Sequence, residues 1–144
     1  MGQDFKHPRR SKKRLGLALI CLALILLGTV FLATASAQPA RLTGTVARVI
    51  DGDTFKLDGL EPSIRIWGLD APEADQAQGP RATRALRHLI LSQHLSCVIR
   101  DIDKYQRIVG QCILSNGRDI AAEMIRMGVA TEYCRFSGGH YRTC

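Results

Sequence analysis

The stretch V-I-D-G-D-T-F-K-L-D-G-L-E-P-S-I-R-I-W-G-L-D-A-P-E, residues 49–73, decides the fold of this chain. Asp51-Gly52 is a strong hairpin signal between two apolar runs. Residues 54–58 alternate between apolar and polar side chains, and residues 64–69 alternate again after a turn rich in Gly and Pro. This period of two predicts two short strands, each with one buried face and one exposed face.

The same stretch gathers three carboxylates and an arginine. Asp53 opens the first of the two strands, and Arg65 lies on the second, on the face opposite the isoleucines. Asp70 and Glu73 follow where the second strand ends. Oxygen ligands together with a guanidinium group are what a metal-assisted attack on a phosphodiester requires.

Working outward, the sequence predicts three more strands and two helices. The further strands span residues 43–50, 95–100 and 107–114, and the helices span residues 79–90 and 119–127. Five strands and two helices, in the order β-β-β-α-β-α with the hairpin of residues 95–114 written as one β unit, indicate an α+β domain built on a small five-stranded barrel. The oligonucleotide-binding (OB) barrel is the known small architecture of this kind.

The first predicted helix carries a basic side. Arg81, Arg84 and Arg87 recur every three residues along it. We interpret this side as a solvated helix face, with a track for phosphate groups as the alternative.

The N-terminal segment, residues 1–37, differs in composition from the rest. A basic cluster within the first 14 residues is followed by an almost wholly apolar run. Ala35-Ser36-Ala37 has the small-x-small form of a signal-peptidase site, which predicts an exported domain over residues 38–144, in the periplasm or the medium. The apolar run over residues 15–35 is also long enough to span a bilayer, so a retained membrane anchor stays open.

The formal net charge of +7 overstates the basicity of the predicted domain. Six of the 20 Lys and Arg residues lie in the N-terminal segment with one of the 13 acidic residues, which leaves 14 basic and 12 acidic residues beyond it. A basic bulk surface is therefore no argument for a nucleic-acid partner, and any electrostatic attraction must come from local clustering.

Four cysteines lie in the predicted domain, at Cys97, Cys112, Cys134 and Cys144. An even number of cysteines in a small exported domain favours disulfides, and four cysteines allow three pairings. Cys97 and Cys112 flank the turn near Lys104 almost symmetrically, so an antiparallel hairpin would place them opposite each other. Cys134 and Cys144 would then close a short C-terminal loop. Free buried thiols remain an alternative, and the spacings fit no common zinc module.

Three segments occur in a fixed order and carry a family resemblance: I-D-G-D-T-F at 50–55, I-R-I-W-G-L-D-A-P-E at 64–73 and D-K-Y-Q-R at 103–107. Over roughly residues 43–130 the chain resembles the staphylococcal nuclease (thermonuclease) family. The resemblance implies an OB barrel and a calcium-dependent enzyme that hydrolyses DNA, RNA or both, leaving products that end in a 3′-phosphate.

The resemblance also implies a metal site. Asp53, Asp70 and the backbone carbonyl of Ala71 match the ligand positions of the family, and such hard oxygen ligands suit one Ca²⁺ ion. Glu73 matches the proposed general base, which would accept a proton from the attacking water or orient that water.

Four further residues match positions that contact the nucleic acid. Arg65 and Arg107 match the two arginines that hold the scissile phosphate, where fixed guanidinium groups stabilise the negative charge of the transition state. Lys104 and Tyr105 match the pair that meets a terminal phosphate and the nucleotide beside it.

The chain departs from the family pattern at the second hairpin and in the tail. Gln106 stands where the family usually has glycine, which would ease a tight turn. The chain ends soon after residue 133, where the family usually packs a third helix, and we infer that a Cys134–Cys144 bond anchors the tail instead. The aromatic residues that would flank a base do not align clearly. The nearby candidates are Tyr133, Phe136 and Tyr141.

Two other functions stay open from the sequence. A non-catalytic OB module would bind nucleic acid, and so keep the barrel, without cleaving it. A membrane-tethered structural protein of the cell envelope would show no effect of calcium on its stability. The expected form is a monomer that contacts a membrane only if the N-terminal segment is retained.

Overall fold

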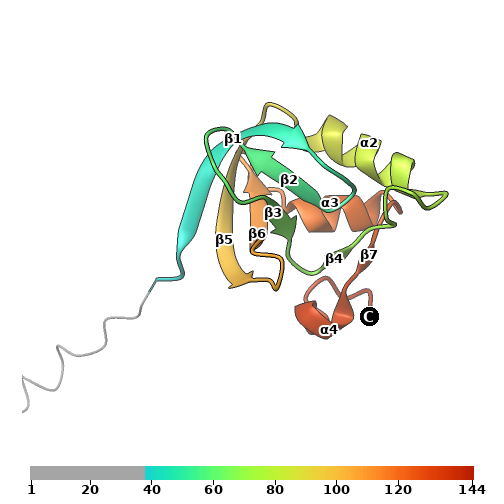
Figure 1. Ribbon diagram of the computed structural model, residues 1–144. Coiled ribbons are helices and arrows are strands. Elements are labelled where there is room, and N and C mark those ends of the chain that lie inside the picture. The colour runs from blue at the N-terminus through green and yellow to red at the C-terminus, as the bar shows by residue number, and fades with distance from the viewer. Residues whose placement is uncertain (1–37) are drawn as a thin grey trace, which may run out of the picture. The chain divides into compact units, whose positions relative to one another are not determined.

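Five strands close into a barrel in the computed structural model, which describes residues 38–144 (Figure 1). Neighbouring strands follow the order β1-β2-β3-β6-β5 around the barrel. The predicted signal peptide or anchor, residues 1–37, lies outside the described residues. The elements are β1 (Arg41–Val49), β2 (Thr54–Leu57), β3 (Ile64–Ile66), β4 (Leu69–Asp70), α2 (Gly79–Ile90), β5 (His94–Ile102), β6 (Ile108–Leu114), α3 (Ile120–Arg126), β7 (Thr131–Glu132) and α4 (Cys134–Ser137).

The predicted α+β barrel of OB type is confirmed. The two strands predicted over residues 95–100 and 107–114 are present as β5 and β6, and both lie between α2 and α3. The order of strands and helices, with each strand of this hairpin counted, is β-β-β-α-β-β-α up to α3, apart from the short β4. The short strands β4 and β7 pair antiparallel in a second sheet, and α4 adds one helical turn to the tail. These short elements escape sequence patterns because two to four residues carry too little periodicity.

The strand predicted over residues 64–69 is broken in the structure. It forms β3 and β4, which are separated by a corner at Trp67 and Gly68. Gly68 has a φ of +69°, and a Cβ atom there would lie 3.0 Å from Cε2 of Tyr141. The C-terminal tail therefore packs against a corner that only glycine accommodates easily.

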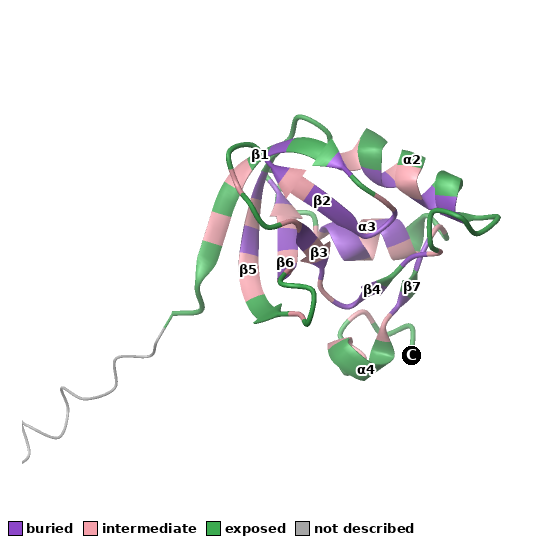
Figure 2. Ribbon diagram, viewed as in Figure 1, coloured by how far each residue is buried: buried purple, intermediate pink, exposed green. Residues whose placement is uncertain are grey.

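The core lies inside the barrel and beneath the two longer helices. Figure 2 shows buried residues interspersed with half-buried and exposed ones along β5, β6 and α2. Ala82, Leu86 and Ile90 of α2 are fully buried, as are Ile120 and Met124 of α3. The apolar spacing that predicts the helices is thus the spacing of their buried faces.

Both predicted disulfides are present. Cys97 on β5 and Cys112 on β6 are direct partners in the antiparallel register, and their bond links the two strands of the second hairpin. The bond between Cys134 and Cys144 closes the tail around α4.

A buried carboxylate also anchors the tail. Glu132 is only 7% exposed, and its two oxygens accept hydrogen bonds from the backbone and side chains of the tail. The donors are the Ser137 hydroxyl at 2.6 Å, the Tyr141 N–H at 2.9 Å, and the Thr143 N–H and hydroxyl, both at 2.9 Å. The predicted disulfide anchor is therefore accompanied by a polar anchor that no sequence pattern indicated.

The hairpin turn between β5 and β6 forms despite the absent glycine. Gln106 adopts a φ of +63°, in the left-handed region that glycine favours. Asp103 holds the turn together, because its side chain accepts hydrogen bonds from the N–H groups of Tyr105 at 2.9 Å and Arg107 at 3.0 Å. The hydrogen bonds to the Asp103 carboxylate thus stabilise a turn that glycine would form more easily.

Within residues 38–144, none of the helices has the length and apolar character that crossing a membrane requires.

We expect replacement of Gln106 by glycine to stabilise the domain. A left-handed conformation costs a non-glycine residue about 1–2 kcal/mol, and glycine loses about 0.5–1 kcal/mol more entropy on folding. Gln106→Gly should therefore raise the free energy of unfolding by up to about 1 kcal/mol in urea titrations. Gln106→Ala keeps the strain and serves as the control. A glycine variant no more stable than the alanine variant would contradict the expectation.

We expect Glu132 to make folding stability depend on acid pH. Burial raises its pKa, but the hydrogen bonds from Ser137, Tyr141 and Thr143 outweigh burial and lower the pKa from 4.5 to about 2. The stabilisation is therefore complete above pH 4.5 and is lost as the pH falls toward 2.

Melting curves across that pH range measure this dependence. Glu132→Gln should melt lower at neutral pH and lose less further stability on acidification than the unchanged chain. Asp75→Asn, in an exposed loop, is the control and should follow the unchanged chain. Parallel pH dependence of Glu132→Gln and the unchanged chain would refute the assignment.

Candidate active site

The site begins with an ion pair between β2 and β3. Asp53, directly before β2, is 6% exposed, and its Oδ2 atom accepts a hydrogen bond of 2.5 Å from Nη1 of Arg65. Its Oδ1 atom accepts a hydrogen bond of 2.8 Å from the Thr54 hydroxyl. Thr54 and Arg65 are antiparallel partners in the β2–β3 register, so the strand pairing itself brings the acid and the arginine together.

The second predicted arginine joins this group through Thr54. Nη1 of Arg107 donates to the Thr54 hydroxyl at 3.4 Å, and its Nε donates to Asp103 Oδ2 at 2.7 Å. The parallel pairing of β3 with β6, in which Ile64 faces Ile108, brings Arg107 beside the first hairpin. The structure thus links Arg65, Asp53, Thr54 and Arg107 in one hydrogen-bonded network.

Two members of this group were missed from the sequence. Thr54 is buried and connects the two arginines, and Asp103 orients Arg107. The signals were present, because Thr54 belongs to D-G-D-T and Asp103 stands four residues before Arg107. Neither spacing says which side chain the residue will contact.

Burial and hydrogen bonding move the pKa values of the two network carboxylates in opposite directions. Burial is the largest influence on Asp53 and raises its pKa, although the Arg65 guanidinium acts to lower it. Burial also acts to raise the pKa of Asp103, but hydrogen bonds from Arg107 and Tyr105 prevail and lower it. Additional positive charge nearby would therefore stabilise the charged form of the Asp53 carboxylate.

The loop after β4 carries the other predicted residues. Nη2 of Arg65 donates to the carbonyl of Leu69 at 3.4 Å, which ties the arginine to the residue before Asp70. A Cβ atom on Gly52 would lie 2.6 Å from Cβ of Ala71, so the turn before Asp53 touches the residue after Asp70. The turn before Asp53 and the residue after Asp70 are therefore in contact, which brings the two parts of the predicted metal site close together.

Glu73 is exposed on this loop, and its backbone is held by the start of α2. A Cβ atom on Gly79 would lie 1.8 Å from the carbonyl oxygen of Glu73, so only glycine permits this approach. Gln76 adds two hydrogen bonds, because its Oε1 accepts from the Glu73 N–H at 3.2 Å and its own N–H donates to the Glu73 carbonyl at 2.9 Å. The loop thus has a defined backbone although the Glu73 carboxylate is solvated.

A cavity of about 490 Å³ opens beside this loop. Asp70, Ala71 and Glu73 line one part of it, and Gln76 and Arg81 line another. Residues 128–131, between α3 and β7, complete the wall. The predicted base therefore lines the same cavity as Asp70 and Ala71 of the predicted metal site.

The predicted metal ligands suit a hard divalent cation in their chemistry. The Asp70 carboxylate is exposed and the Ala71 carbonyl is close to the Asp53 turn, as the contact with Gly52 shows. The site would combine two carboxylates and one carbonyl, an oxygen set that Ca²⁺ accepts. Within residues 38–144, no three His, Cys, Asp or Glu side chains are grouped as a metal site. The ligand roles therefore stay predictions.

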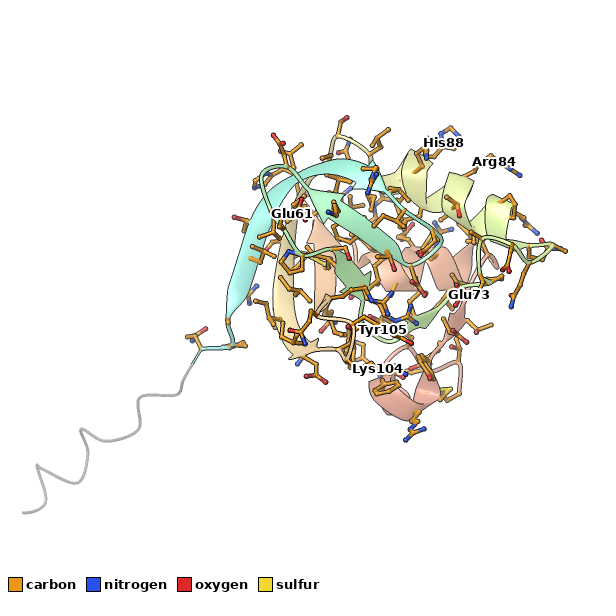
Figure 3. The ribbon with its side chains drawn as sticks, in the orientation of Figure 1. Glu61, Glu73, Arg84, His88, Lys104 and Tyr105 are labelled. Carbon is orange, nitrogen blue, oxygen red and sulfur yellow. A yellow bond between two sulfur atoms is a disulfide. The ribbon has the colours of Figure 1, made fainter. Side chains whose placement is uncertain are left out.

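The predicted nucleotide contacts lie at the tip of the second hairpin. Figure 3 shows Lys104 and Tyr105 there, with Glu73 on the separate loop that leads into α2. Tyr105 is 67% exposed, and the guanidinium carbon of Arg107 lies 5.3 Å from the centre of its ring. An exposed ring beside a phosphate-binding candidate is suited to contact a nucleotide.

The candidate base-flanking aromatics separate into two groups. Tyr133 and Phe136 pack edge to face, with ring centres 4.7 Å apart, and Phe136 is 56% exposed. Tyr141 instead packs against Trp67 at 6.1 Å and contacts His140, so it belongs to the tail packing. The guanidinium carbon of Arg100 on β5 lies 5.0 Å from the centre of the Trp67 ring, so β5 also contacts this aromatic group.

Comparison with known proteins places these features in a family. The family model described as "Staphylococcal nuclease homologue" matches residues 63–143, which include Arg65, Asp70, Glu73 and Arg107. Asp53 and Thr54 lie before the matched segment.

Several known proteins are similar to this chain in sequence. The protein called ParB of Escherichia coli is 35% identical over 117 residues, covering 74% of this chain and 66% of the relative. An "uncharacterized endonuclease" of Escherichia coli is 31% identical over 100 residues, covering 68% and 65% of the two chains. A protein called micrococcal nuclease, of Shigella flexneri, is 33% identical over 107 residues, covering 65% and 60%. The chain thus spans slightly less than two thirds of the length of these relatives.

The matched segment covers more than half of the chain and contains the strand arginine, the acidic loop and the hairpin arginine in the order described above. The chain belongs to the family of staphylococcal nuclease homologues.

Proposed function

We propose that this chain is an exported nuclease that hydrolyses phosphodiester bonds of DNA, RNA or both, with one Ca²⁺ ion as its cofactor. The observation that carries the proposal is the network in which Arg65 and Arg107 meet through Asp53 and Thr54, beside the acidic loop. Relatives named as nucleases support the same reaction class.

The two arginines would hold the scissile phosphate. Both are fixed by carboxylates and are only partly exposed, with side-chain exposures of 19% for Arg65 and 25% for Arg107. Guanidinium groups held in this way need little reorganisation when negative charge develops on the phosphate oxygens. Their planar donor pattern also suits paired hydrogen bonds to phosphate, which a lysine could not provide.

Glu73 would accept a proton from the attacking water or orient that water. Its carboxylate is solvated and lines the cavity, so water reaches it freely. Asp53, Asp70 and the Ala71 carbonyl would hold the cation, which supplies charge neutralisation at the phosphate when it is bound. Lys104 and Tyr105 would contact the nucleotide at the hairpin tip, on the side of the site where Arg107 lies.

The disulfides support an exported protein. Disulfides persist in oxidising compartments and are rare in the cytosol. Both bonds in this chain join cysteines that the sequence spacing pairs, and one of them closes the tail beside the site. Export to the periplasm or medium, with or without a retained anchor over residues 15–35, is consistent with this chemistry.

We expect the full chain, oxidised and held in mild detergent, to cleave nucleic acid in calcium. Single-stranded DNA, duplex DNA and RNA are each incubated with calcium, with magnesium and with chelator. Glu73→Gln should lower the rate about 10²–10⁴-fold because it removes the proton acceptor. Arg65→Lys should lower it about 10²-fold or more because it keeps the charge but loses the planar fork.

Glu61→Gln is the matched control for Glu73→Gln. Glu61 is an exposed acid on the opposite side of the barrel region in Figure 3, and it should tolerate the change with little effect. Circular dichroism confirms that each variant is folded. A folded, oxidised chain that binds nucleic acid but cuts none would sink the nuclease proposal and favour the non-catalytic binding module.

We expect calcium to stabilise the folded chain even without a substrate. A ligand that binds only the native state raises the free energy of unfolding by about 2.7 kcal/mol at 100 times its dissociation constant. Asp70→Asn should abolish the shift in melting temperature, while Asp75→Asn, in the same loop, should retain it. Equal melting temperatures in calcium and in chelator would instead agree with a structural envelope protein.

A further inference from the structure

The exposed face of α2 carries three arginines in a row. Arg81, Arg84 and Arg87 are all exposed, whereas Ala82, Leu86 and Ile90 on the opposite face are fully buried in the core. The rise of a helix places Arg81 and Arg87 about 9 Å apart along the axis. The row is therefore fixed to the barrel by the buried face and presents its charge to solvent.

These arginines have no acidic partners among residues 38–144. In the described part of the chain, ion pairs involve five other basic residues, and α2 itself contains no acidic residue. The basic residues in those pairs are Lys56, Arg65, Arg107, Arg118 and Arg126. The α2 row is thus a local concentration of positive charge in a domain that is nearly balanced overall.

The row is continuous with the candidate active site. Arg81 lines the same cavity as Asp70 and Glu73, and the loop between them leads directly into α2. In Figure 3 the Arg84 side chain points outward from α2, and it lies farther from Glu73 than the start of this helix does. A nucleic-acid strand that is bound at Arg65 and Arg107 and passes Glu73 would therefore contact Arg81 next.

We infer that the α2 row binds the phosphate backbone of a nucleic-acid strand that continues beyond the scissile bond. This inference rests on the proposed nuclease function. It specifies the substrate as a long strand, because a mononucleotide or a short fragment would not reach the row. Arg81 is the residue nearest the cavity, and Arg84 and Arg87 extend the contact.

An anionic membrane is the other polyanionic surface that such a row could meet. Helices that bind a membrane surface insert an exposed apolar face beside their basic residues. The apolar face of α2 is already buried in the core, which leaves mainly charge for a lipid surface to contact. Nucleic acid is therefore the occupant that the structure favours.

The test measures binding rather than cleavage, so its outcome is independent of catalysis. The full chain is titrated with a fluorescent single strand of about 30 nucleotides in chelator, long enough to pass several phosphate contacts. The variant Arg81→Gln/Arg84→Gln/Arg87→Gln is compared with Arg41→Gln/Arg118→Gln/Arg126→Gln, which removes the same charge from exposed positions outside α2. Glutamine and arginine have similar helix propensities, so α2 should remain folded.

We expect the α2 variant to bind at least about tenfold more weakly at 50 mM salt, while the control variant loses much less. Three lost phosphate contacts should also reduce the slope of log affinity against log salt by about 2, so that the advantage of the unchanged chain is largely lost at 200 mM salt.

Three results would overturn the inference. One is equal binding by the α2 variant and the unchanged chain, and another is an equal loss in the control variant, which would indicate only net charge. The third is loss of binding to vesicles rich in phosphatidylserine without loss of binding to the strand, which would assign the row to a membrane. Failure of calcium-dependent cleavage with an intact effect on binding would reject the nuclease proposal and keep the row as a binding surface.

Discussion

The candidate site depends on the ion pair between Asp53 and Arg65. Asp53 is almost wholly buried, and a buried charge that loses its partner costs about 3–5 kcal/mol, so each residue requires the other. Asp53 precedes β2 and Arg65 lies on β3, hence the pair couples the alignment of these strands to the position of both charges. Arg65 also reaches the Leu69 carbonyl, which extends the same constraint to the start of the acidic loop.

Much of the fold could be predicted because its signals are local. The Val, Thr and Ile residues of the segment 43–50 and the alternation in residues 54–58 indicate strands. The near-symmetric spacing of Cys97 and Cys112 about a turn indicates their pairing across a hairpin. The corner at Gly68 could not be predicted, since the residues that pack against it, Ser137 and Tyr141, lie in the distant tail. The Glu132 anchor was missed for the same reason: its donors are defined only once the tail has folded.

The candidate site, too, could be predicted only in part from the sequence. The sequence places Asp53, Arg65, Asp70, Glu73 and Arg107 at suggestive spacings, and the structure links Asp53, Arg65 and Arg107 through hydrogen bonds. The spacings do not identify the supporting residues Thr54 and Asp103, because the roles of these residues depend on contacts across strands and turns. Asp103 also explains how Gln106 can occupy a glycine conformation, since its hydrogen bonds hold the turn that the strained residue completes.

The two halves of the site differ in how firmly they are held. The arginines rest on barrel strands or beside them, and carboxylates fix both guanidinium groups. Asp70 instead presents an exposed carboxylate at the end of β4, where it pairs with Thr131, and Glu73 presents one from the following loop, whose backbone is held mainly by Gly79 and Gln76. In the proposed reaction the phosphate therefore meets preorganised charge, while the water-activating side gains its final geometry from the cation and the substrate. A strand extended along α2 would contact Arg81 at the far end of that loop, so binding of a long substrate and ordering of Glu73 are expected to reinforce each other.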